Sequence, residues 1–140
     1  GNLAIEYYSG YTLPNQGFSA ESTKHYSDYR YDEHNRVISK KATLATGDII
    51  TYTYTYDSAG RLTEKVQYTV FSDSEAAYWE ITDSTETYTY TYDDNGRKIA
   101  ESKLYQSTKL DGKTTENVWN AKYTYTNGYY YHFSETLPVT

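Results

Sequence analysis

Carboxylates and histidines are the side chains of this sequence whose chemistry could support catalysis or metal binding. A glycosidase needs two carboxylates at a defined separation, and strands can supply them. Carboxylates at strand positions are numerous, and the sequence selects no pair: Asp28, Glu64, Glu80, Glu86 and Glu101. The three histidines lack the spacing that metal sites use: His25, His34 and His132. With no Gly-x-Ser-x-Gly motif and no glycine-rich phosphate loop, the sequence predicts no catalytic residue, no metal site and no cofactor.

Aromatic side chains are the one feature rich enough to suggest a binding site. Flat, amphipathic rings on a sheet can stack on sugars or anchor a protein partner. The alternative is that they cap the open end of the sheet, where backbone groups would otherwise be exposed. The candidate ligand-binding residues are the aromatics outside the repeated segments: Trp79, Trp119, Tyr129, Tyr130 and Tyr131.

The composition excludes several classes of protein. A net charge of −6 without a basic stripe argues against nucleic-acid binding. No apolar run approaches the ~20 residues of a membrane-spanning helix. Cysteine is absent, so the chain has neither disulfides nor thiolate ligands. Aliphatic residues are few, whereas there are 20 tyrosines, which predicts an aromatic-rich core.

The N-terminus suggests processing. The chain contains no methionine and begins with Gly1, although translation starts with Met. Removal of an export signal, or its replacement by the remnant of an expression tag, would leave such an end. We therefore expect an exported protein that is periplasmic, exposed at the cell surface or secreted.

Strand-type alternation dominates the sequence, and the same strand and turn recur. The hexapeptide YTYTYD occurs at residues 52–57 and again at 88–93. Each copy opens a frame, Tyr-x-Tyr-Asp-x-x-Gly-Arg, which also fits residues 29–36 with Asn in place of Gly. The frame is typical of a three-residue hairpin loop with one residue in the left-handed region, where Gly and Asn are favoured. The predicted turn residues are Asp32, Asn35, Arg36, Asp57, Gly60, Arg61, Asp93, Gly96 and Arg97.

The aspartate that opens each turn has a structural explanation. Its carboxylate can accept a hydrogen bond from a backbone N–H two residues further on. If Asp57 and Arg61 pair directly, Tyr54 faces Glu64 and Tyr52 faces Val66. That register predicts tyrosines on one face of the sheet and threonines on the other. Residues 72–77 are interpreted as a longer loop between two hairpins.

The repeated frame resembles a known family. Tyr-x-Tyr-Asp-x-x-Gly-Arg-Leu is similar to the signature of YD repeats, also called RHS repeats, which occur in bacterial surface and toxin-delivery proteins and in animal teneurins. Residues 54–62 carry it most closely, and the resemblance covers about residues 26–126. It implies a sheet of successive hairpins and a small exported bacterial protein of YD-repeat type, and it supplies no active site.

Together these features predict an all-β, antiparallel meander of about eight or nine strands. It should form one curved, twisted sheet or a partly rolled sandwich. We expect a single domain over residues 1–140, weakly defined in 1–23, with YD-like repeats in about 26–126 and an aromatic C-terminal hairpin in about 123–134.

The function predicted is a non-catalytic binding or scaffold module that recognises glycans or cell-surface groups, including another surface protein, through exposed aromatics. A structural or protein-interaction domain that associates through edge strands is the alternative. A hydrolase with an unrecognised carboxylate pair is a third reading.

Overall fold

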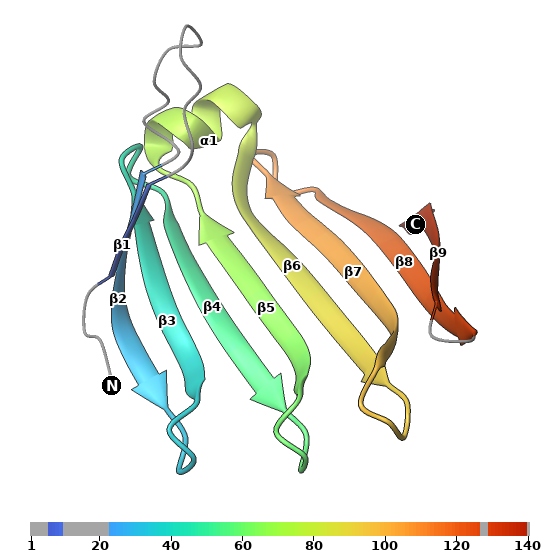
Figure 1. Cartoon of the computed structure of the whole chain (residues 1–140). Coiled ribbons are helices and arrows are strands. Elements are labelled where there is room, and N and C mark those ends of the chain that lie inside the picture. Colours follow the sequence, from blue (N-terminus) through green and yellow to red (C-terminus); the bar gives the residue numbers. More distant parts are fainter. Residues whose placement is uncertain (1–5, 10–22, 127–128, 140) are drawn as a thin grey trace, which may run out of the picture.

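The protein is one antiparallel sheet of nine strands in which each strand pairs with the next one in the sequence (Figure 1). The computed structural model describes residues 6–9, 23–126 and 129–139, with side chains described for 24–125. The elements are β1 (Glu6–Ser9), β2 (Thr23–Tyr31), β3 (Val37–Leu44), β4 (Ile49–Tyr56), β5 (Leu62–Val70), α1 (Asp73–Trp79), β6 (Ile81–Tyr92), β7 (Lys98–Lys109), β8 (Thr114–Thr126) and β9 (Tyr129–Val139).

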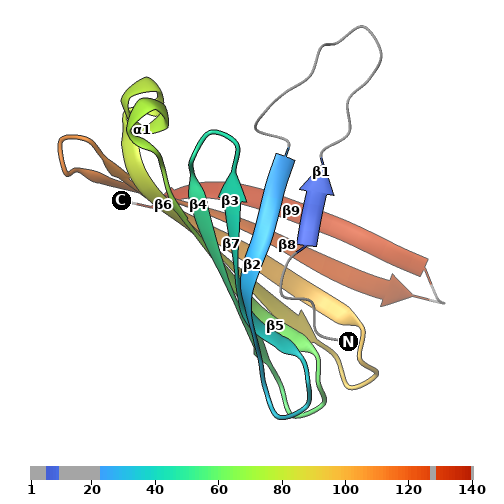
Figure 2. The same ribbon diagram turned by 90° about the vertical axis from the view of Figure 1, so that its left-hand side faces the viewer.

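The predicted meander is confirmed, in its single-sheet form. The strand order β1 to β9 leaves β1 and β9 as the outer strands, and the sheet twists strongly from one end to the other (Figure 2). No second sheet covers either face among the described residues. The sheet is therefore an open, single layer, and both of its faces are accessible over much of their area.

The loop predicted for residues 72–77 is wrong, because this segment opens the only helix of the described chain, α1. Ser72 is its N-cap, and the Ser72 hydroxyl accepts a hydrogen bond from the N–H of Glu75. Ser-x-x-Glu is a helix-start pattern, so the sequence did carry the signal. Glu80 ends the helix in the left-handed conformation, with φ 61°.

The register predicted beyond the second turn is also wrong, by one residue. Tyr54 lies opposite Lys65 and Tyr52 opposite Gln67, because a β-bulge at Thr63 follows the pair Tyr56–Leu62. One residue of slip moves every later side chain to the other face. Val66 therefore joins the threonine face, and Lys65 joins the tyrosine face.

The same irregularity follows the other two turns. The register shifts between Arg30 and Tyr31 in β2, and between Thr91 and Tyr92 in β6. A bulge two residues after the turn arginine is thus part of the repeat. We define the tyrosine face as the face that carries Tyr52, Tyr54 and Tyr88, and the threonine face as the opposite one.

The buried core lies on the tyrosine face and is small. Tyr26, Ala42, Ile50 and Tyr52 form its buried cluster, and the rings of Tyr26 and Tyr52 lie 6.2 Å apart. Among the described residues, no large side chain is fully buried. Contacts between neighbouring strands, rather than a second layer, therefore carry most of the packing.

The glycine of the second turn provides a stability test. Gly60 has φ +85°, and a Cβ placed there would lie 3.3 Å from Nη1 of Arg36. We expect Gly60→Ala to destabilise the fold by about 1–2 kcal/mol, because a Cβ is strained in the left-handed region. Gly60→Asn should cost less, since Asn35 holds the equivalent position with φ 63°. Urea unfolding of the three chains measures the order, and equal stability of the two variants would contradict it.

Candidate functional site

The turn aspartates bind the backbone of their own hairpins. The Oδ1 atom of Asp57 accepts hydrogen bonds from the N–H groups of Ala59 and Arg61, both at 2.9 Å. Its Oδ2 accepts a hydrogen bond from Nε of Arg61 at 2.8 Å. The first and third turns repeat these contacts at Asp32 with His34 and Arg36, and at Asp93 with Asn95 and Arg97.

These contacts lower the pKa of the turn carboxylates. The largest cause for Asp57 is the backbone N–H of Arg61, and the Arg61 side chain adds to it against a smaller opposing effect of burial. The pKa values of Asp32 and Asp93 are lowered by the corresponding groups. Each Asp–Arg pair therefore stabilises its own turn.

Each turn is also joined to the next hairpin, through a contact that we call the Arg–Tyr contact. The guanidinium of Arg61 lies over the ring of Tyr92, with Cζ 5.0 Å from the ring centroid. The Tyr92 hydroxyl donates a hydrogen bond to the Leu62 carbonyl at 2.6 Å. Two further copies join Arg36 and the Val37 carbonyl to Tyr56, and Arg97 and the Lys98 carbonyl to Tyr125.

The Arg–Tyr contact also explains why the Tyr frame persists in β8, where the turn motif has decayed. Tyr125 occupies the position of Tyr56 and Tyr92, although no Asp-x-x-Gly-Arg follows it in the sequence. The guanidinium of Arg97, from the preceding turn, lies over its ring. This tyrosine is therefore kept because it contacts the preceding turn, and the Arg–Tyr contacts fix the positions of successive hairpins relative to each other.

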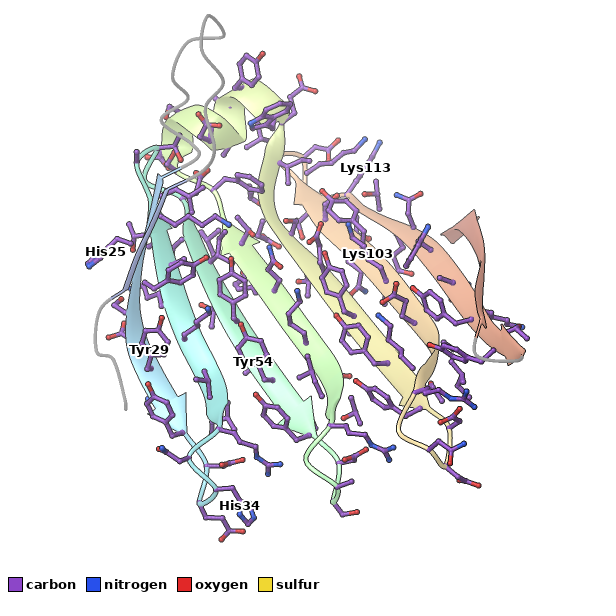
Figure 3. All side chains as sticks on the ribbon, viewed as in Figure 1. His25, Tyr29, His34, Tyr54, Lys103 and Lys113 are labelled. Atoms are coloured by element: carbon purple, nitrogen blue, oxygen red, sulfur yellow. The ribbon has the colours of Figure 1, made fainter. Side chains whose placement is uncertain are left out.

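Lysines and tyrosines alternate over the tyrosine face. Nζ of Lys40 lies 4.2 Å from the ring centroid of Tyr26, and Nζ of Lys65 lies 4.4 Å from that of Tyr88. Figure 3 shows Tyr54 and Lys103 on the same side of the sheet. Ammonium groups over ring faces are attracted by the ring quadrupole, so the lysine side chains of this face are held in place without being buried.

Glu86 is the main anion in the middle of this face. It accepts a hydrogen bond from the Tyr88 hydroxyl at 2.9 Å and pairs with Nζ of Lys103 at 3.1 Å. Burial, and then the carboxylate of Glu86, raise the pKa of Tyr88 to about 12. Tyr88 therefore stays a neutral hydrogen-bond donor at any physiological pH.

An open hollow of about 500 Å³ lies beside these groups on β7 and β8. Its size is typical of small-molecule sites. Two cross-strand pairs supply most of its lining, Lys103 with Trp119 and Tyr105 with Asn117. The site thus combines two aromatic rings, an amide and an ammonium group, with Glu86 bound to the same ammonium.

The aromatic residues singled out in the sequence lie at different places in the structure. Trp119 lines the hollow, whereas Trp79 lies on α1 and is 57% exposed. The Trp79 indole N–H donates to Glu75, and its ring packs edge-on against Tyr78. The side chains of Tyr129, Tyr130 and Tyr131 lie outside the described side chains, although their backbone forms the start of β9.

Sequence reasoning missed Tyr105, Asn117 and Lys103 as partners of Trp119. Asn117 could have been found from the alternation of β8, because it lies two residues before Trp119 in the same strand, whereas Lys103 and Tyr105 follow only from the register of β7 against β8. Among the side chains of residues 24–125, no group of three His, Asp or Glu residues could hold a metal ion.

A meander of hairpins that share one turn geometry, each joined to the next by the Arg–Tyr contact, defines a repeat protein. The family model of the RHS repeat matches residues 31–69, which include the first two turns. Residues 31–69 therefore match the RHS, or YD, repeat that the turns of this segment predicted. This repeat is typical of structural and cell-surface modules. Among curated proteins and among solved structures, none matches the chain.

In the described part of the chain, no helix has the length and apolar character needed to cross a bilayer.

The hydrogen bond of the Arg–Tyr contact can be tested by removing one hydroxyl group. Tyr92→Phe removes the hydrogen bond to Leu62 but keeps the ring under Arg61, so we expect a loss of about 0.5–1.5 kcal/mol in the free energy of unfolding. Tyr78→Phe is the matched control, because Tyr78 is 75% exposed on α1. Equal stability of the two variants in urea unfolding would rule out the hydrogen bond of the Tyr92 hydroxyl as a source of stability.

The turn carboxylates predict a loss of stability in acid. Their pKa values are lowered by folding, so the stability they contribute is present above the ordinary aspartate pKa of about 4 and is lost as the pH falls through the lower folded values. Urea unfolding at a series of pH values below 5 should show this fall. Asp57→Asn should flatten it, and a parallel curve for that variant would contradict the assignment.

Proposed function

We propose that the protein is a non-catalytic, exported binding module that takes a carbohydrate in the hollow beside Trp119. The observation that carries the proposal is the composition of this hollow, in which two aromatic rings stand next to an amide and an ammonium group. Sugar rings present apolar faces that stack on aromatic side chains and hydroxyls that need polar partners. Export agrees with the use of RHS repeats in cell-surface proteins.

The parts of the hollow have separate roles in this proposal. Trp119 and Tyr105 provide the stacking surfaces. The Asn117 amide can donate to one hydroxyl and accept from another. Lys103, held by Glu86 at 3.1 Å, offers its remaining protons to ligand oxygens.

The alternative function, association through the edges of the sheet, has its own support. β9 is eleven residues long and is the last strand in the order, so one side of it can pair with another strand. Sedimentation over a range of protein concentrations separates the two functions. A dimer that forms with concentration, together with no response to any glycan, would favour edge association.

Tryptophan fluorescence can test the carbohydrate site, because the chain has two tryptophans and only Trp119 lines the hollow. In a screen of soluble glycans, Trp79→Phe should keep the ligand-dependent change, whereas Trp119→Phe should lose it. Trp119→Ala should weaken binding by about tenfold or more, since stacking residues at the centre of a site contribute at least ~1.4 kcal/mol.

The two single-tryptophan chains also define the contrary results. A signal that persists in Trp119→Phe and disappears in Trp79→Phe would move the site to α1. Silence of both chains across the whole screen would refute carbohydrate binding.

A further inference from the structure

The helix α1 lies outside the repeated frame, between the second and third turns, and it presents aromatic rings to solvent. Tyr78 and Trp79 are 75% and 57% exposed, which makes them the most exposed large hydrophobic side chains of the described residues. The two rings pack edge-on at 4.8 Å, and Glu75 accepts a hydrogen bond from the indole N–H at 2.9 Å. Both rings are therefore held in a fixed position, although neither is buried by the chain itself.

The helix is attached to the sheet at both of its ends. Asp48, in the β3–β4 turn, accepts a hydrogen bond from the N–H of Ser72 at 2.8 Å. The carbonyl of Glu80 accepts one from the N–H of Leu110, in the β7–β8 turn, at 3.2 Å. Figure 1 shows α1 beyond one end of the strands, so its exposed residues project from a rigid support.

The exposed end of α1 is acidic. Asp73 and Glu75 lie in its first turn, Glu80 follows its last residue, and the helix contains no basic residue. Glu80 has φ 61°, a region that favours Gly and Asn, and its carboxylate lies at the helix C-terminus, where the helix dipole repels it. No ion pair of the described residues involves Glu80. A residue that breaks two local rules in this way indicates a role outside the helix.

We define the α1 tip as Tyr78, Trp79 and Glu80. The tyrosine face offers the complement to it, an aromatic hollow of about 500 Å³ and an excess of positive charge. The described strand positions of this face carry five lysines and two glutamates: Lys24, Lys40, Lys65, Lys98, Lys103, Glu86 and Glu101.

We propose that the α1 tip of one copy of the chain inserts into the hollow of a second copy. The Trp79 ring packs against Trp119 and Tyr105, and the Glu80 carboxylate pairs with Lys103 at the hollow. Because tip and hollow are different surfaces, the contact is heterologous, and further copies can add head to tail. This inference goes beyond the proposed function, since it concerns the hollow when no carbohydrate fills it.

A second copy fits the α1 tip better than a lipid surface does. Interfacial helices that bind membranes combine their aromatic residues with basic ones, which attract anionic headgroups, whereas α1 is acidic. A copy of the same chain supplies both an aromatic-lined hollow and unlike charge. One helix tip makes a small interface, so we expect weak association, in the upper micromolar range.

Sedimentation equilibrium of two complementary variants tests the contact. Trp79→Ala removes the tip and keeps the hollow, whereas Trp119→Ala alters the hollow and keeps the tip. We expect the mean mass of the unmodified protein to rise with concentration and each variant alone to stay monomeric. An equimolar mixture of the two variants should form dimers and nothing larger, because one intact tip and one intact hollow remain in each pair.

Glu80→Asn separates docking from helix stability. Asparagine removes the charge and is favoured at positive φ, so thermal unfolding should occur at the same or a higher temperature. Association should nevertheless weaken about two- to fivefold, and the association of the unmodified protein should weaken as salt is raised.

Tyr68→Ala is the control for loss of an exposed ring, since Tyr68 is 41% exposed and lies on the threonine face, opposite Thr51. It should leave association unchanged. Thermal unfolding checks the fold of every variant, and Lys103→Glu is the second hollow variant if Trp119→Ala does not fold.

Three results would overturn the inference. The first is an unmodified protein that stays monomeric at every concentration. The second is association of Trp79→Ala alone as strong as that of the unmodified protein, which would assign the contact to the strand edges. The third is a monomeric mixture of the two variants, which would show that the tip does not meet the hollow. No carbohydrate is present in these measurements, so none of the three results bears on the proposed sugar site.

Discussion

The contact between one hairpin's turn arginine and the next hairpin's tyrosine is the interaction on which this structure depends. A single-layer sheet has no second layer to fix the positions of its hairpins, so their alignment rests on strand pairing and on contacts between successive repeats. The turn aspartate holds the arginine, the arginine covers the tyrosine ring, and the tyrosine hydroxyl binds a carbonyl beside that arginine. Because each contact joins nearest neighbours only, stability is distributed along the sheet as in other repeat proteins.

The sequence predicted the class of fold, the sites of the turns and the family, because these follow from local patterns. Asp57 and Gly60 predict a hairpin from the local sequence alone, whatever the rest of the chain does. The bulge at Thr63 could not be predicted in the same way, since it changes only the register of the strands and its recurrence two residues after each turn arginine is visible only in their pairing. The helix α1 was missed for another reason: its Ser72-x-x-Glu75 start was read as loop because strand patterns surround it.

The candidate site depends on the register of the strands, which the sequence did not predict. Trp119 was conspicuous as an aromatic residue outside the repeat, but its partners follow from the pairing of β7 with β8. Lys65 illustrates the same limit more sharply. Without the bulge it would lie on the threonine face, and with it the ammonium lies over Tyr88. A one-residue irregularity in the turn thus places the positive charge on the face that carries the aromatic rings.

The scarcity of aliphatic residues and the accessibility of the tyrosine face have one physical origin. A core of leucine and isoleucine would have to be covered by a second layer, because exposing that surface to water is unfavourable. Tyrosine contributes ring area to contacts between strands and still tolerates water at its hydroxyl. Lysines over the rings retain their hydration while adding cation–π attraction. A sheet built in this way is stable with one face open, and an open face lined with rings and fixed charges is available to a binding partner.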